Sequence, residues 1–128
     1  MINLKDFLNS YVIANNINRD EFISPSRKRE IVDSRMIYCV VARNLGGYTL
    51  SEIGRSINRD HATVLYAIRN YDHLSNYDES MKHKYYKASI IYRTLEYKPK
   101  AERVGLIDTL FETNRKLRQR IAKLEELN

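Results

Sequence analysis

Glycine and proline are scarce in this chain, and apolar side chains recur every three or four residues along most of it. The 128 residues include four Gly and two Pro, and neither Asn-Gly nor Asp-Gly, the dipeptides typical of tight β-hairpin turns, occurs. Spacings of three and four residues place apolar side chains on one face of an α-helix. The sequence therefore predicts an all-α, multi-helix fold.

The helices are bounded by a few strong breaks. Ser24-Pro25-Ser26 interrupts the apolar pattern, Gly46-Gly47 can end a helix in the left-handed conformation, and Pro99 cannot continue one. Thr49 followed three residues later by Glu52 forms a capping-box pattern that predicts a helix start. We expect helices over residues 3–15, 30–45, 50–57, 60–75, 79–97 and 101–127.

These helices group into three parts. Residues 1–76 are predicted to form one helix-turn-helix unit. Residues 77–100 form a basic, Tyr-rich helix that packs on this unit or extends it, and its lysines could widen a binding surface or only solvate the helix. Residues 101–128 form an amphipathic helix that either makes a coiled coil or lies back on its own domain.

Composition favours a soluble cytoplasmic protein with a polyanionic partner. Lys and Arg number 22 against 16 Asp and Glu, which gives a formal net charge of +6, and the excess lies in the middle of the chain. The single cysteine, Cys39, stands in an apolar run, which predicts a buried, reduced thiol. No stretch reaches the roughly 20 apolar residues of a membrane span, and no secretory leader pattern opens the sequence.

The segment Thr49–Asn70 has the parts of a helix-turn-helix. A short capped helix is followed by a tight turn and a longer helix, and that second helix opens with small or polar residues. The first turn of such a helix enters the DNA major groove, where small polar side chains reach base edges. Free N–H groups at a helix start also suit a phosphate. The segment is therefore a candidate reader of duplex DNA.

Two runs in this segment carry a family resemblance. Tyr48-Thr-Leu-Ser-Glu-Ile-Gly54 and Arg59-Asp-His-Ala-Thr-Val-Leu-Tyr-Ala67 resemble the signature of the C-terminal DNA-binding domain of the bacterial replication initiator DnaA. The resemblance covers about residues 2–75. It implies base readout by Asp60, His61 and Ala62. It also implies contacts to phosphates or the minor groove by Arg27, Lys28, Arg29, Arg35, Arg59 and Thr63.

Some of these residues have a plainer interpretation. Asp60 is a good helix N-cap in any protein, and Arg27-Lys28-Arg29 could be only a solvated loop. Tyr66 and Tyr71 are expected in the core or at its rim rather than as platforms for bases.

The sequence departs from the family pattern at several places. The connection from Gly54 to Arg59 is one residue shorter, and Asn58 stands where a glycine pair is common. Ala62 replaces a Ser or Thr, and Asp33 stands where the family has its minor-groove arginine. The family's own DNA box is therefore not assumed as the target. The G-x-x-x-x-G-K-[ST] loop of the family's ATPase module is missing, which excludes nucleotide binding by that route.

The C-terminal segment follows a heptad pattern. Apolar residues and one Asn occupy the a and d positions, a pattern that favours two parallel strands with a fixed register. The predicted oligomerisation residues are Ile107, Leu110, Asn114, Leu117, Ile121 and Leu124. A homodimer or a partner helix is one interpretation, and packing on its own domain is the other.

Two functions from different classes fit these observations. The first is sequence-specific binding of double-stranded DNA, as a transcription regulator or a replication accessory factor. The alternative is an interaction adaptor that has lost DNA contact and works through its C-terminal helix, for which Asp33 and the shortened turn are the best support. We expect no enzyme, cofactor or metal, since His61, His73 and His83 are not spaced with carboxylates as a site.

Overall fold

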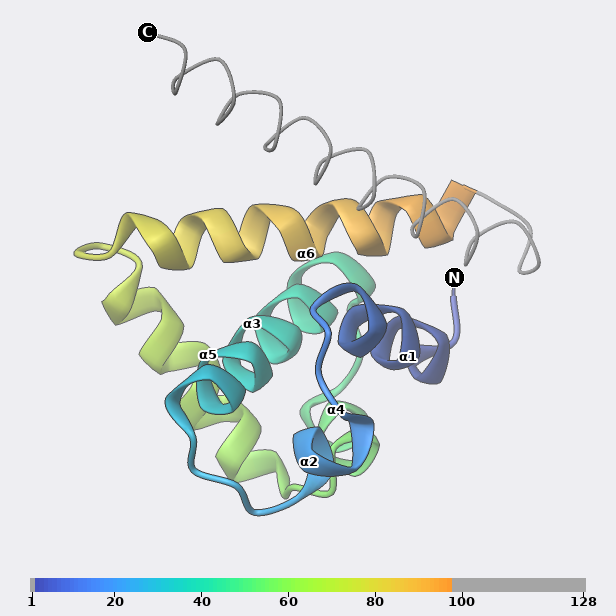
Figure 1. The fold of residues 1–128 in the computed structure, drawn as a ribbon, viewed down its shortest axis with the longest axis horizontal. Coiled ribbons are helices and arrows are strands. Elements are labelled where there is room, and N and C mark those ends of the chain that lie inside the picture. The colour runs from blue at the N-terminus through green and yellow to red at the C-terminus, as the bar shows by residue number, and fades with distance from the viewer. Residues whose placement is uncertain (1, 98–128) are drawn as a thin grey trace, which may run out of the picture.

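The computed structural model describes residues 2–97, and every regular element in that range is a helix. Figure 1 shows one long helix, Glu79–Tyr97, lying across a cluster of shorter ones. The all-α prediction is confirmed for this part of the chain, whereas the helix expected over 101–127 lies outside the described residues. In chain order the helices are α1 (Leu4–Ala14), α2 (Arg19–Ile23), α3 (Arg29–Gly46), α4 (Leu50–Ser56), α5 (His61–Leu74) and α6 (Glu79–Tyr97).

Helix α3 is the centre of the fold. Every residue from Met36 to Ala42 is buried, and α3 contacts α5 and α6 more extensively than other elements. The Tyr38 ring stacks on Phe7 of α1 at 5.3 Å and meets Phe22 of α2 edge-on at 5.8 Å. The middle of α3, which is buried on all sides, thus holds α1, α2, α5 and α6 together.

The predicted buried cysteine is confirmed. Cys39 is 1% exposed, and burial raises the pKa of its thiol to about 12. At neutral pH the group is therefore a neutral thiol that packs as a small apolar side chain.

Helix α6 contributes to the same core. Five of its residues are buried: Met81, Ala88, Ile91, Tyr92 and Leu95. They recur at helical spacing on one face, so α6 is amphipathic and packs lengthwise on α1 and α3.

No helix in residues 2–97 is long and apolar enough to cross a membrane.

Helix α2 is absent from the sequence-based prediction. It has only five residues, too few for an apolar period to show. A local signal was available, because the side chain of Asn18 caps the backbone N–H of Glu21 at 3.1 Å, and Asp20 and Glu21 suit a helix start. Phe22, which is fully buried, fixes this short helix to the core.

Candidate nucleic-acid interface

Helix α4 begins at the predicted capping box. The hydroxyl of Thr49 accepts a hydrogen bond from the backbone N–H of Glu52 at 3.1 Å. The carboxylate of Glu52 accepts one in return from the backbone N–H of Thr49 at 3.4 Å. Ile53 on the next turn is fully buried, so the cap sets the start of α4 and the core sets its rotation.

The turn between α4 and α5 closes on the carbonyl of Gly54. This oxygen accepts from the backbone N–H of Ile57 at 3.1 Å and from that of Arg59 at 2.8 Å. The N–H of Asn58 reaches the Arg55 carbonyl at 3.5 Å, which completes a Schellman-type helix end. Such an end requires one residue with positive φ, and here that residue is Asn58, with φ 58°. Asparagine tolerates this conformation better than other residues that carry a side chain, so the shortened connection forms a regular turn without glycine.

This geometry predicts the effect of two substitutions at Asn58. Asn58→Ala should destabilise the fold by about 1 kcal/mol, because alanine pays the full cost of the left-handed conformation, whereas Asn58→Gly should change stability by less than about 0.5 kcal/mol. Urea unfolding followed by circular dichroism measures both. Asn70→Ala, inside α5, is the control and should be neutral or slightly stabilising. Equal effects at the two asparagines would contradict the role assigned to the turn.

The first turn of α5 is capped by Asp60. One carboxylate oxygen of Asp60 accepts from the backbone N–H of Thr63 at 2.8 Å and from its hydroxyl at 2.7 Å. The side-chain and backbone hydrogen bonds from Thr63 lower the pKa of Asp60. His61 and Ala62 lie on the same turn and are exposed. Asp60 and Thr63 therefore order the helix start, and His61 and Ala62 are the side chains presented outward.

Arg59 connects this helix start to the basic loop, residues 24–28, between α2 and α3. Its guanidinium donates to the carbonyls of Ile23 and Ser24 on the loop side, and to those of Ile57 and Asn58 in the turn. In Figure 1 the loop passes beside the start of α5 at the bottom of the view. The basic loop and the first turn of α5 are thus held on one side of the molecule.

Arg35, on α3, also holds this loop. Its guanidinium donates to the carbonyls of Phe22, Ser26 and Ser24, each at 2.7 Å, and of Glu21 at 3.3 Å. Burial, and then the nearby Arg59 guanidinium, lower the pKa of Arg35. Four of its five N–H donors are therefore engaged within the protein.

The six residues predicted to contact phosphates or the minor groove fall into two groups. Arg35 and Arg59 point inward to backbone carbonyls, and the Thr63 hydroxyl is engaged by Asp60. Residues 27–29, at the end of the loop and the start of α3, are exposed. Lys28 pairs with Glu21 at 3.1 Å, Arg29 approaches Asp33 at 3.9 Å, and Arg27 makes no ion pair within residues 2–97.

Asp33 is surrounded by basic groups. Its carboxylate lies 3.9 Å from the guanidinium of Arg29 and 3.8 Å from the ammonium of Lys84 on α6, and its side chain is 18% exposed. The acidic residue that stands in place of an arginine therefore anchors two cations, and its charge is offset where it lies. Its contact with Lys84 also brings α6 to the side of the basic loop.

Tyr66 and Arg69 were not among the predicted site residues. Both are exposed, and Tyr66 is 70% exposed, so it is not in the core. They follow Ala62 by four and seven residues, a spacing that puts them on the same face of α5. In the sequence, this spacing was the signal that could have placed Tyr66 and Arg69 on the same helix face as Ala62. No cluster of three or more His, Cys, Asp or Glu side chains that could hold a metal occurs among residues 2–97.

Comparison with known proteins shows which proteins this part of the chain is similar to. The profile described as "Bacterial dnaA protein helix-turn-helix" matches residues 12–70. The Chromosomal replication initiator protein DnaA of Rhizobium meliloti (strain 1021) is 37% identical over 70 residues, which cover 54% of this chain and 15% of the relative. The DnaA of Pseudothermotoga lettingae is 33% identical over 69 residues, covering 54% and 16%. That of Bacteroides thetaiotaomicron is 49% identical over 45 residues, covering 34% and 10%. The matched segments are thus between 10% and 16% of the length of these relatives.

Proposed function

We propose that the protein reads a specific sequence in double-stranded DNA with the first turn of α5, because residues 12–70 match the helix-turn-helix of bacterial DnaA, which is a DNA-binding fold. The observation that carries the proposal is the exposure of His61 and Ala62 on a helix start that Asp60 caps and Arg59 ties to the basic loop. A reader of base edges needs such a rigid and accessible first turn.

The hydrogen bonds support a separate proposed role for each residue at the interface. His61 and Ala62 contact base edges, with the ring of His61 as the polar group and the methyl group of Ala62 against a thymine methyl. Arg27 on the basic loop and Arg29 at the start of α3 contact the phosphate backbone, and Lys28 adds positive charge. Arg35 and Arg59 support DNA binding indirectly, because they hold the basic loop in place. Asp60 does so by capping the start of α5. The role is that of a transcription regulator or a replication accessory factor, since both use the same DNA-reading domain.

Two features that favoured an adaptor without DNA contact now have a structural account. The shortened turn closes with regular hydrogen bonds around Asn58, and the charge of Asp33 is offset by Arg29 and Lys84. Neither feature obstructs the first turn of α5. The heptads of residues 107–128 lie outside the described residues, so pairing with a second chain and packing on the same domain both stay predictions.

Selection from randomised duplex DNA, sequenced at two salt concentrations, tests the proposal. We expect one enriched motif. On that motif, His61→Ala should weaken binding by about 1–3 kcal/mol, roughly 5- to 150-fold, and relax the preference at one position. Arg27→Ala should weaken binding to all sequences and reduce the slope of log affinity against log salt by about one.

His73→Ala is the matched control, because His73 is exposed at the far end of the same helix. It should leave both the motif and the affinity unchanged. Absence of an enriched motif, with no salt-dependent binding, would contradict the proposal. The remaining function would then be that of an interaction adaptor without DNA contact. An enriched motif that His61→Ala leaves intact would mean that another surface reads the sequence.

A further inference from the structure

Helix α6 is apolar on a second face, opposite the one that enters the core. Tyr86, Ile90 and Tyr97 are 64%, 42% and 74% exposed, and together with Thr94 they recur at spacings of four, four and three residues. We call these four residues the α6 outer face. Its spacing is that of a helix contact surface.

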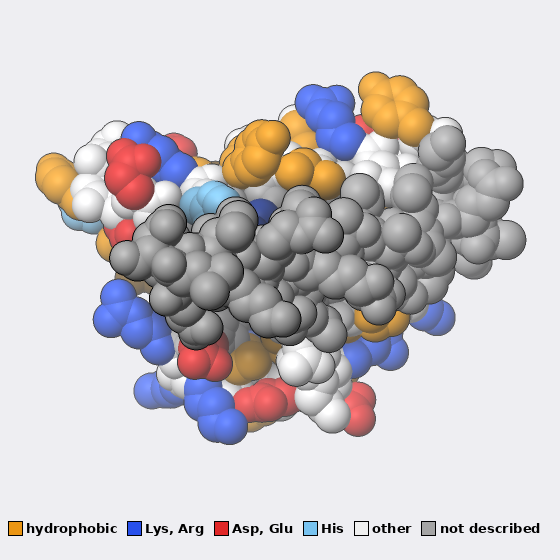
Figure 2. Space-filling model, turned by 45° about the horizontal axis from the view of Figure 1, so that its top comes forward, with side chains coloured by type: hydrophobic (Ala, Val, Ile, Leu, Met, Phe, Trp, Pro, Cys, Tyr) orange, Lys and Arg blue, Asp and Glu red, His pale blue; other side chains and the backbone are white. Residues whose placement is uncertain are grey.

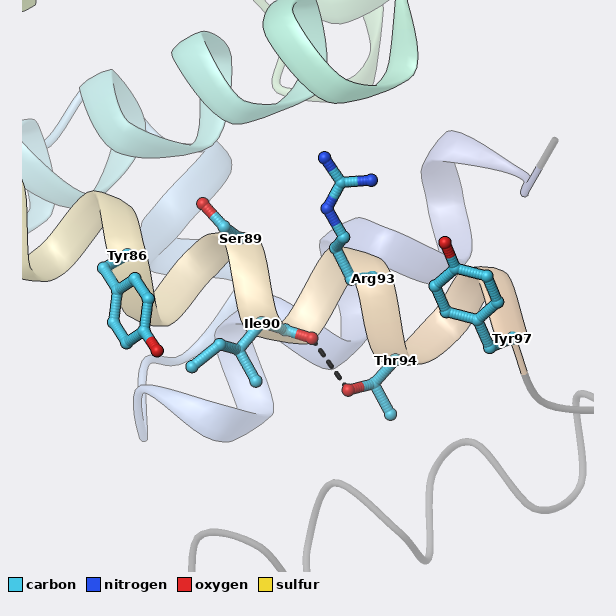
Figure 3. Close-up of a pocket in the computed structure, with 6 residues that line it drawn as sticks. All are labelled: Tyr86, Ser89, Ile90, Arg93, Thr94 and Tyr97. Carbon is cyan, nitrogen blue, oxygen red and sulfur yellow. Dashed lines mark hydrogen bonds between the residues drawn. The ribbon is translucent and has the colours of Figure 1, made fainter.

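The α6 outer face lines a shallow groove. Among the described residues, the groove is lined by this face together with Ser89 and Arg93, all from α6. Figure 3 shows Tyr86, Ile90 and Thr94 pointing to the same side of the helix, away from α3. The Thr94 hydroxyl donates to the Ile90 carbonyl at 2.7 Å, which leaves its methyl group outward. Figure 2 shows hydrophobic side chains projecting along one edge of the molecule, with a Lys or Arg side chain between them.

The chain itself supplies a complementary segment directly after this face. Thirty-one residues follow Tyr97, and Pro99 prevents α6 from continuing into them. A short connection after a helix leads to an antiparallel neighbour. A helix of eleven residues, the length of the segment 104–114, would span about 15 Å, and the α6 outer face spans about 16 Å.

We infer that residues 104–114 of the same chain pack antiparallel on the α6 outer face. In this register Val104 lies opposite Tyr97, Phe111 opposite Ile90, and Asn114 opposite Tyr86. The sequence pattern puts Val104, Ile107, Phe111 and Asn114 on one helical face. Asn114 then has the phenolic group of Tyr86 as a hydrogen-bond partner, which gives its polar side chain a role without a second chain.

A tethered segment fits this face better than a second copy does. Four side chains on one helix cover much less than the roughly 800 Å² per partner that a stable interface between free proteins needs. A segment joined to the face by a few residues has an effective concentration in the millimolar range, so a small contact suffices. The inference does not depend on DNA binding.

Limited trypsin digestion of the full chain, with sedimentation to measure oligomeric state, tests the inference. In the wild type we expect a monomer with slow cleavage at Arg103, Arg115 and Lys116. Ile90→Glu should raise cleavage there at least about tenfold, because proteolysis follows the population of the open form. It should leave the thermal transition of the core in place. Phe111→Glu should reproduce this result from the other side of the contact.

Ile13→Glu is the matched control, since Ile13 is 57% exposed on α1 and the same change there should leave cleavage after residue 97 unaltered. A wild-type dimer that Ile90→Glu converts to monomer would assign the α6 outer face to a second copy and overturn the inference. Cleavage that is fast in the wild type, or equally fast in Ile90→Glu and in the control Ile13→Glu, would show that the segment does not cover the face.

Discussion

Replacing Arg35 by methionine should lower the stability of the protein by about 2–4 kcal/mol in the absence of DNA. The substitution keeps an apolar stem and removes a guanidinium that donates to the carbonyls of four residues within the stretch 21–26. A hydrogen bond from a charged donor contributes about 1.5–3 kcal/mol, and water at the loop replaces part of this. For a domain of about 100 residues the loss corresponds to a fall in melting temperature of roughly 10–25 °C.

The measurement distinguishes two roles for Arg35. If it is a phosphate contact, as the family resemblance implies, Arg35→Met should leave the melting temperature unchanged and lower the salt dependence of DNA binding. If it holds the basic loop, the melting temperature falls without DNA. Arg43→Met is the matched control on the same helix, because Arg43 donates a single hydrogen bond to the Tyr48 carbonyl, and its loss should cost less than about 1 kcal/mol.

Features set by neighbouring residues could be predicted from the sequence. The ends of α3 at Gly46-Gly47 and of α4 at Thr49 follow from the glycine pair and the capping box, which act over three or four residues. The burial of Tyr92 follows from helical spacing on α6. These are local rules, and the structure confirms them in residues 2–97.

The positions of the two central arginines could not be predicted in this way. The partners of Arg35 lie 9–14 residues away in the chain, and the Ser24 carbonyl lies 35 residues from Arg59. Sequence periodicity carries no information at these separations. Asp33 is a similar case, because its cation on α6, Lys84, comes into reach only once α3 and α6 pack together.

Gly54→Ala should be the most damaging single substitution in the α4–α5 turn. An added Cβ atom would lie 2.4 Å from the carbonyl oxygen of Arg59 and 3.2 Å from that of Asp60. These are backbone atoms, so they cannot move aside as a flexible side chain would. Overpacking of this kind costs about 1–3 kcal/mol or more, and here it also pushes the start of α5 away from α4.

The direction of the stability change caused by Gly54→Ala distinguishes a steric clash from ordinary helix propensity. Gly54 is inside a helix, where alanine is ordinarily favoured over glycine by about 1 kcal/mol, so any destabilisation is due to the clash and understates its cost by about that amount. Gly47→Ala is the control: its φ of 66° strains an alanine, yet no atom lies within 4 Å of an added Cβ. We expect both variants to be destabilised in thermal unfolding. Only Gly54→Ala should also lose the enriched DNA motif at a temperature where it remains folded, because only this change displaces His61 and Ala62. A stabilised Gly54→Ala variant with an unchanged motif would show that the close approach of the two helices does not set the position of α5.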